Sequence, residues 1–360
     1  MAAKTAEDPT KAILSESALH EKHLCDYVIN VATGCRHGCK FCYVPGTPNI
    51  RTRGQMLNDT VGVEDSQAEW GEYVLYRDDI PDRLPGILDR KRTWKTTEKG
   101  RGIVGVSFHT DCFMDRRAGD ITAKVVETLA DHGRYCRILT RNPMLAANYM
   151  DTFEAAGEYV TVGSSIPTLN EDHIRAIEPK APPIQARLEG LQRFADAGVP
   201  VYVSMSPTYP TIRTERQMEM LLRQIKNLSP SVVFHEPINP RGSNYEMTVA
   251  AAEEAGCDDL AHALTEVQGP GEWLRYACTH FEWVQNLTDR LDMPRQLWPD
   301  KKLANTAPMR VGEWLQGWRD RGSPEPFAGR PEPDLPPMPP QAFPWERQTT
   351  LTFGGDVGGE

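Results

Sequence analysis

Short runs of apolar and β-branched residues alternate along the chain with longer stretches in which apolar residues recur at helical spacing. The stretches 121–132 and 184–197 both show this spacing, and a glycine (Gly133 and Gly198) follows each of them as a common helix stop. Alternation of this kind predicts βα units that build a parallel sheet.

Six apolar runs follow one another in this way and predict parallel strands at 26–33, 103–108, 137–140, 159–163, 199–205 and 231–235. The fold class is therefore α/β. Six βα units in one order predict a partial (β/α)6 barrel of the TIM type, and a doubly wound open sheet is the alternative.

The length of 360 residues, of which 39% are hydrophobic, is enough for one large domain with appendages. We expect a polar N-terminal segment at 1–22, a barrel domain at 23–320 with a polar insertion at 46–100, and a tail at 321–360. The tail is rich in proline and glycine, which predicts an extended or disordered arm. The alternative is an ordered tail wrapped over the barrel.

Composition also limits the compartment and the partners. The polar start of the chain has no apolar signal region, and no run approaches the ~18 apolar residues of a membrane span. Eight mostly scattered cysteines fit a reducing cytoplasm, so we expect a cytoplasmic protein without a membrane partner. The net charge of −10 disfavours tight, sequence-blind binding to nucleic acid, although a local basic groove stays open.

The most informative motif is the spacing of Cys35, Cys39 and Cys42, which is C-x3-C-x2-C. Cubane iron–sulfur clusters are normally held by four thiolates. A set of three thiols can hold a 4Fe-4S cluster and leave one iron open for an external ligand. The chemistry that uses such an iron is the reductive cleavage of S-adenosylmethionine (SAM), whose amino and carboxylate groups chelate it.

Other interpretations of these cysteines remain open. His37 could complete a four-ligand zinc site, although the loop is cramped for one. Cys39 and Cys42 alone have the spacing of a thioredoxin-like redox pair, which leaves Cys35 unexplained. A disulfide between two of them is disfavoured, because nothing else in the sequence indicates an oxidising compartment. No second clustered motif, and therefore no auxiliary cluster, is expected from the other cysteines, which are Cys25, Cys112, Cys136, Cys257 and Cys278.

Polar residues follow four of the predicted strands, where a parallel barrel gathers its catalytic groups. They are Thr110, Asp111, Arg141, Ser165 and Ser204. Bound SAM needs an acceptor for its amino group, a cation or hydroxyl for its carboxylate, and hydroxyls for its ribose. Arg141 suits the carboxylate because a guanidinium binds it through two hydrogen bonds. The alternative for each serine or threonine is a turn or a helix cap.

Over about 24–303, the chain resembles the radical SAM superfamily, and within it the spore photoproduct lyase family and related "DNA repair photolyase" proteins. The segments that carry the resemblance are 34–44 (GCRHGCKFCYV), 70–74 (WGEYV), 110–111 (TD), 165–170 (SIPTLN), 178–182 (EPKAP) with Arg187, 197–200 (AGVP), 206–210 (SPTYP), 235–237 (HEP) and 297–301 (LWPDK).

The resemblance implies an enzyme that cleaves SAM to a 5′-deoxyadenosyl radical and abstracts a hydrogen from a nucleobase, in repair or modification of DNA. It implies SAM contacts at Thr110, Arg141 and Ser165. It also implies that Phe41 and Tyr43 shield the cluster and shape the adenine site, and that Tyr43 relays a hydrogen atom. The electron would come from a donor such as flavodoxin or ferredoxin.

Two positions depart from the lyase pattern. Phe41 stands where the lyase has a tyrosine, and the nearest thiol to the lyase's hydrogen-donor position is Cys112. Cys112 is a candidate hydrogen donor, or alternatively a buried small hydrophobe. Two other functions stay open: a radical SAM enzyme that acts on a small metabolite or peptide, which the lack of a basic domain favours, and a non-catalytic iron–sulfur partner protein.

Overall fold

The computed structural model describes residues 3–22, 24–94, 102–240 and 243–320. The predicted tail at 321–360 lies outside the described residues. Two sheets are present in the described part of the chain. The strands are β1 (Lys4–Glu7), β2 (Ser15–Glu16), β3 (Tyr27–Ile29), β4 (Ala32–Gly34), β5 (Tyr73–Tyr76), β6 (Val104–Val106), β7 (Cys136–Leu139), β8 (Val160–Ser165), β9 (Val201–Thr208), β10 (Val233–Pro237) and β11 (Arg295–Leu297).

The larger sheet has the order β11-β10-β9-β8-β7-β6-β3-β2, and every neighbouring pair from β3 to β11 is parallel. Only the β2–β3 pair in this sheet is antiparallel. The strands follow one another in chain order, without the reversal that defines a doubly wound sheet. The prediction of a partial TIM-type barrel is therefore confirmed, with β11 as an additional parallel strand.

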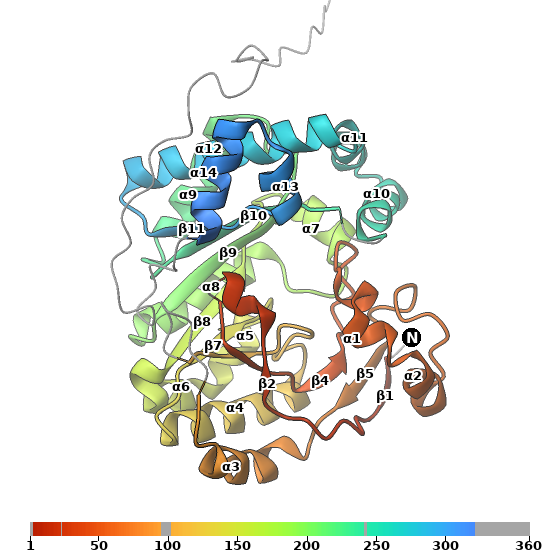
Figure 1. Cartoon of the computed structure of the whole chain (residues 1–360), viewed down its shortest axis with the longest axis vertical. Coiled ribbons are helices and arrows are strands. Elements are labelled where there is room, and N and C mark those ends of the chain that lie inside the picture. Colours follow the sequence, from red (N-terminus) through yellow and green to blue (C-terminus); the bar gives the residue numbers. More distant parts are fainter. Residues whose placement is uncertain (1–2, 23, 95–101, 241–242, 321–360) are drawn as a thin grey trace, which may run out of the picture.

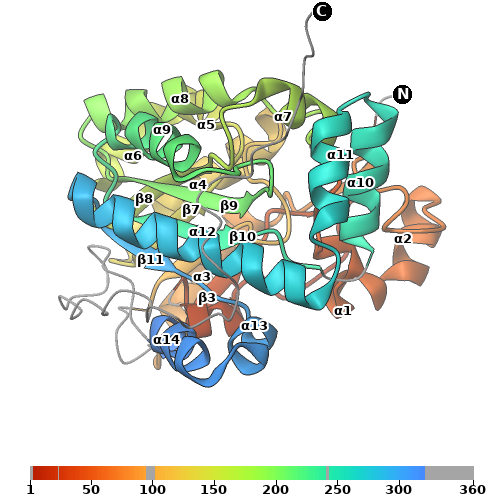
Figure 2. The ribbon, with the colours of Figure 1, turned by 90° about the horizontal axis from the view of Figure 1, so that it is seen from above.

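Helices cover the outer side of the strands (Figures 1 and 2). The α-helices are α1 (Pro48–Arg51), α2 (Gly54–Val61), α3 (Ile80–Arg90), α4 (Arg116–Asp131), α5 (Pro143–Ala146), α6 (Met150–Ala156), α7 (Glu171–Ile177), α8 (Ile184–Asp196), α9 (Glu215–Lys226), α10 (Asn244–Glu254), α11 (Asp258–Glu266), α12 (Pro270–Leu291), α13 (Lys301–Thr306) and α14 (Met309–Asp320). Both helices predicted from apolar spacing are present, as α4 and α8.

The strand predicted at 26–33 is wrong as a single element, because the chain leaves the barrel sheet at Asn30. The Asn30 carbonyl accepts a hydrogen bond from Arg77 Nη1 at 3.1 Å, and its side-chain oxygen accepts one from the His109 N–H at 3.0 Å. The Asn30 carbonyl is thus bonded to a side chain and not to a neighbouring strand, so β3 ends at Ile29 and β4 starts a second sheet with the order β1-β5-β4. The cysteine loop therefore follows β4 and not the first barrel strand.

The segment 46–100, expected to be a polar insertion, supplies the central strand of this second sheet. All four residues of β5 are buried, and β5 pairs antiparallel with β4 and parallel with β1. The second sheet thus fixes the strand that leads directly into the cysteine loop.

Candidate functional site

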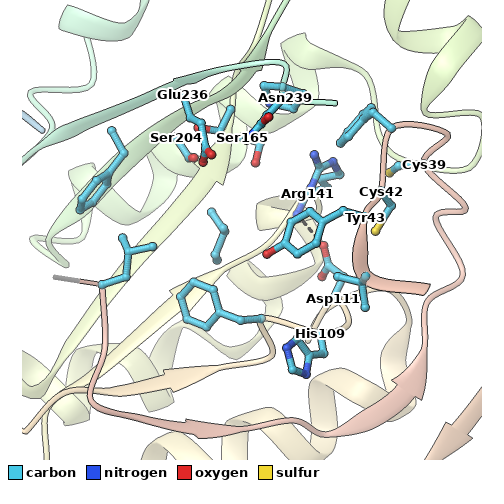
Figure 3. A pocket seen from close by; sticks show the side chains of 18 of the residues that line it. Cys39, Cys42, Tyr43, His109, Asp111, Arg141, Ser165, Ser204, Glu236 and Asn239 are labelled. Carbon is cyan, nitrogen blue, oxygen red and sulfur yellow. Dashed lines mark hydrogen bonds between the residues drawn. The ribbon is translucent and has the colours of Figure 1, made fainter. Parts of the chain in front are cut away.

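A cavity of about 250 Å³ lies at the carboxyl ends of the barrel strands, and Figure 3 shows it from close by. Residues at or just after the ends of three successive strands, and one residue midway along the next strand, form its wall. These are Thr110 and Asp111 after β6, Arg141 after β7, Ser165 on β8 and Ser204 on β9. The structure therefore brings together the strand-end residues that the sequence predicted to be near one another.

The cysteine loop lines the same cavity with Cys35, Cys39 and Cys42. It begins at Gly34, whose φ of +91° favours glycine. A Cβ at this position would lie 2.3 Å from the Tyr73 carbonyl oxygen on β5. A larger residue would therefore separate β4 from β5 and displace the loop.

Hydrogen bonds from two other parts of the chain hold the loop against the barrel. The Lys40 N–H donates to the Ile177 carbonyl at 2.9 Å. The Thr110 hydroxyl, predicted to contact SAM, donates to the Gly34 carbonyl. Thr110 therefore anchors the start of the cysteine loop in this structure.

Burial dominates the chemistry of the three thiols. It raises the pKa of Cys35 to about 12 and of Cys42 to about 11, and it raises the pKa of Cys39 well above its usual value. Hydrogen bonds act in the opposite direction, from the His37 backbone N–H to Cys35 and from the Trp70 side chain to Cys42. Such bonds to sulfur are the kind that tune bound iron–sulfur clusters.

The donor set, three thiols in one loop, is of the type that holds iron–sulfur clusters. No group of three or more His, Cys, Asp or Glu side chains in the described ranges is arranged to hold one ion. Thiolates of a cubane cluster bind different irons, so their sulfurs lie farther apart than the ligands of one tetrahedral ion. His37, the fourth ligand of the zinc interpretation, has its Nδ1 3.2 Å from the Lys180 carbonyl oxygen and its Nε2 3.2 Å from Asp111 Oδ2, so both ring nitrogens face oxygen atoms.

Asp111 is a buried carboxylate that joins three parts of the site. Its Oδ1 accepts hydrogen bonds from Thr140 Oγ1 at 2.6 Å and from the Phe113 N–H at 2.9 Å. Its Oδ2 accepts one from the Arg141 N–H at 2.6 Å and lies 3.2 Å from His37 Nε2. Burial acts to raise the pKa of Asp111, but His37 and these hydrogen bonds outweigh it and lower the pKa to about 2.

Arg141 belongs to a buried group of charges next to Cys39. Glu178 Oε2 accepts hydrogen bonds from Arg141 Nε and from Arg187 Nη2, both at 2.7 Å, and lies 4.0 Å from the Cys39 sulfur. The Arg141 guanidinium also lies 5.1 Å from the centre of the Phe41 ring. Burial acts to lower the pKa of Arg141, but the charge of Glu178 outweighs burial and raises the pKa above its ordinary value. Arg141 therefore stays a cation facing the cavity.

The remaining predicted residues also line the cavity. Ser165 and Ser204 are paired in register on β8 and β9, and both are buried. Tyr43 is 40% exposed, and its ring points into the cavity in Figure 3, whereas Phe41 is buried. Their placement is compatible with the predicted adenine and ribose contacts.

Cys112 is the predicted residue that the structure does not bring to the cavity. Its side chain is 0% exposed, belongs to the main hydrophobic core, and is absent from the cavity wall. The loop turns inward directly after Asp111, so a residue that follows a strand end in sequence packs under the site. This is the buried small hydrophobe that the sequence left as the alternative.

Several residues of the site were not identified as site residues from the sequence. Glu178, Arg187 and Glu236 appeared only as parts of family segments, and Asn239 was not singled out. Glu236 and Asn239 line the cavity at the end of β10. Their position at the end of the sixth predicted strand was the signal that could have identified them.

The fold and the cavity together define a parallel α/β barrel whose strand ends face a cysteine-rich loop. A sequence profile of the radical SAM superfamily matches residues 29–225, more than half of the chain. The chain belongs to the radical SAM superfamily. Membership implies a 4Fe-4S cluster, bound SAM and an electron donor that reduces the cluster.

Sequence similarity to known proteins extends over more than half of the chain. An uncharacterized protein of Acidianus two-tailed virus is 30% identical over 245 residues, which are 66% of this chain and 76% of the relative. An uncharacterized protein of Methanocaldococcus jannaschii is 23% identical over 187 residues, 52% of this chain and 61% of the relative. An uncharacterized protein of Mycobacterium tuberculosis is 25% identical over 222 residues, 60% of each chain.

Two solved structures have similar folds but lower sequence identity than these relatives. Spore photoproduct lyase complexed with dinucleoside spore photoproduct gives a TM-score of 0.49 at 16% identity, covering 69% of this chain and 66% of the other. Streptococcus suis SuiB bound to S-adenosylmethionine gives 0.45 at 9% identity, covering 78% and 51%. This chain thus spans slightly less than two thirds of the lyase. Among the described helices, none has the length and apolar character that a membrane crossing requires.

Proposed function

We propose that this protein is a radical SAM enzyme whose 4Fe-4S cluster is held by Cys35, Cys39 and Cys42 and whose substrate is a nucleobase. The observation that carries the proposal is one cavity lined by three clustered thiols and by the polar ends of successive barrel strands. When bound, the reduced cluster supplies the electron that cleaves SAM to the 5′-deoxyadenosyl radical, which removes hydrogen from the substrate.

The chain's own residues bind and orient SAM in this proposal. Arg141 has its Nε fixed by Glu178, so its terminal nitrogens are left to bind the SAM carboxylate. Ser165 and Ser204 offer hydroxyls to the ribose, and Phe41 packs beside the adenine. Asp111 and Thr110 keep the cysteine loop and Arg141 in place through the hydrogen bonds described above.

Tyr43 is the proposed hydrogen relay, because its phenol reaches into the cavity. The burial of Cys112 outside the cavity wall argues against the same role there. A donor such as flavodoxin or ferredoxin is the proposed source of the electron.

The aromatic side chains of the cavity support a nucleobase as the substrate. Phe108, Tyr202, Phe234 and Trp298 line it together with the cysteine loop. Planar bases that are taken out of a stack are held between rings of this kind. A net charge of −10 disfavours binding to the phosphate backbone of a nucleic acid. It therefore favours a second candidate substrate, a small metabolite or peptide.

The test is anaerobic reconstitution followed by reduction with dithionite in the presence of SAM. We expect 5′-deoxyadenosine from the wild type and from Cys257→Ser, which alters a partly exposed thiol outside the cavity wall. We expect none from Cys35→Ala, Cys39→Ala or Cys42→Ala. Product formation by these three variants would refute the assigned ligands.

Salt dependence separates the two substrate classes. Binding of a thymine-containing oligonucleotide that weakens as salt rises supports a nucleic-acid substrate. Absent or salt-insensitive binding favours the metabolite or peptide.

A further inference from the structure

Tyr202 and Phe234 form an aromatic wall of the cavity, and neither is among the residues proposed to bind SAM. The rings of Tyr202 on β9 and Phe234 on β10 meet edge to face, with centroids 5.7 Å apart and planes at 84°. The buried Arg137 guanidinium lies 5.7 Å from the Tyr202 ring and 5.4 Å from the Phe234 ring. A cation beside both rings holds them in place, so this part of the cavity is preformed.

Gly163 on the neighbouring strand β8 makes room for this wall. A Cβ at Gly163 would lie 2.3 Å from the Tyr202 ring. The ring therefore lies directly over the backbone of β8. Tyr202 and the Phe234 ring that meets it edge-on therefore form a tightly packed corner of the cavity, against which a planar ligand could lie.

Glu236 lies at the edge of the same wall, two residues after Phe234 on β10. The β9–β10 register shifts between His235 and Pro237, and an irregularity of this kind re-aims the side chain within it. Glu236 lines the cavity, and Figure 3 shows it on the same side of the cavity as Ser204, away from the cysteines.

Among the described residues, one oxygen of Glu236 has a hydrogen-bond partner and the other has none. Its Oε2 accepts a hydrogen bond from Lys22 Nζ at 2.9 Å, and Lys22 also lies 5.5 Å from the Trp298 ring. The structure gives Oε1 no hydrogen-bond partner among the described residues. A carboxylate paired with an ammonium group accepts hydrogen bonds and donates none.

We propose that Glu236 recognises the substrate nucleobase by accepting a hydrogen bond from a ring or exocyclic N–H while the base lies against Tyr202 and Phe234. This inference rests on the proposed function and names the edge of the base that the enzyme recognises. With one oxygen that has no partner among the described residues, the site selects a base by one N–H donor. A base that carries a methyl group in place of that hydrogen would lose the bond and clash with the carboxylate.

The test compares nucleosides with their N-methylated counterparts on the reconstituted protein in the presence of SAM. Equilibrium dialysis would measure the four deoxynucleosides, each beside the analogue methylated at its N–H edge, for example thymidine beside 3-methylthymidine. For the bases that bind, we expect the wild type to prefer the unmethylated form by about tenfold or more, as for one hydrogen bond to a charged group.

Three variants isolate the role of the carboxylate. Glu236→Ala should bind both forms equally. Lys22→Met removes the same ion pair but keeps the carboxylate, so it should retain the preference. Glu215→Ala, which breaks an exposed ion pair with Arg290, should behave as the wild type.

Equal binding of both forms by the wild type, a preference that survives in Glu236→Ala, or no binding of any nucleoside would each overturn this inference. Formation of 5′-deoxyadenosine without substrate, measured on the same samples, keeps the two proposals apart. If SAM is still cleaved, only the substrate assignment fails. If it is not, the proposed function fails.

Discussion

Replacing Glu178 by glutamine tests the buried charge group beside the cysteine loop. The carboxylate is 0% exposed and accepts hydrogen bonds from Arg141 and Arg187 at 2.7 Å each. Glutamine keeps the shape of the side chain and one acceptor, but it removes the only negative charge that these three residues share.

The structure sets the size of the expected loss. Removing one partner of a buried ion pair typically destabilises a protein by about 3–5 kcal/mol, because the other charge stays buried without compensation. Arg187 is 0% exposed, whereas Arg141 is 18% exposed and keeps some contact with solvent. We therefore expect Glu178→Gln to lower the free energy of unfolding by about 3 kcal/mol, the lower end of that range.

Urea denaturation of the cluster-free protein measures this loss, with Glu189→Gln as the matched control. Glu189 is an exposed helix residue that accepts a hydrogen bond from Gln185 at 3.0 Å, so its change should stay within about 0.5 kcal/mol. A loss below about 1 kcal/mol for Glu178→Gln would refute the reasoning about the buried charges.

The difference in unfolding free energy between wild type and Glu178→Gln should also depend on pH, which gives a second test of the buried charges. Burial acts to raise the pKa of Glu178, but Arg141 and Arg187 lower it below the ordinary 4.5. A carboxyl group with a lowered pKa stabilises the fold above its unfolded pKa, and this stabilisation is lost as the pH falls through the folded pKa. The difference between wild type and Glu178→Gln should shrink as the pH falls below 4.5.

Three further outcomes are expected. The pKa of Asp111 falls from 3.8 to about 2, so the wild type should lose about 2 kcal/mol of unfolding free energy between those pH values, and Asp111→Asn should not, as measured by acid titration of stability. Because burial raises the pKa of Cys42 from 9.0 to about 11, iodoacetamide should alkylate it in cluster-free protein about a hundredfold more slowly near neutral pH than an ordinary thiol, with the rate rising as the pH rises; mass spectrometry of the labelled peptide reports this. Gly163→Ala places a Cβ against Tyr202 and should destabilise the fold by about 1–3 kcal/mol, and an unchanged melting temperature would contradict the close packing.

The barrel could be predicted from the sequence because six of its strands are apolar runs that recur between helices. Strand β11 could not, because Arg295 and Gln296 make two of its three positions polar. Both are buried through tertiary contacts, such as the ion pair of Arg295 with Asp289 at 2.5 Å. The break at Asn30 was missed for a related reason, since its hydrogen-bond partners Arg77 and His109 come from distant segments.

The candidate site was predictable where its residues are close in sequence or directly follow a strand. The cysteine spacing is local, and Arg141 follows β7. The pairing of Glu178 with Arg141 spans 37 positions and depends on how two loops fold together. Cys112 also follows a strand, but its place could not be predicted. The chain turns inward one residue after Asp111, so the Cys112 side chain packs in the core and not in the cavity.

The most direct test of the account is Mössbauer spectroscopy of the anaerobically reconstituted protein, recorded with and without SAM. If Cys35, Cys39 and Cys42 hold a cubane through three of its irons, the sample should contain about four irons per chain. Addition of SAM should then change the signal of one iron and leave the others unaltered. A two-iron centre, a single metal ion, or a four-iron spectrum in which no iron responds to SAM would contradict the account.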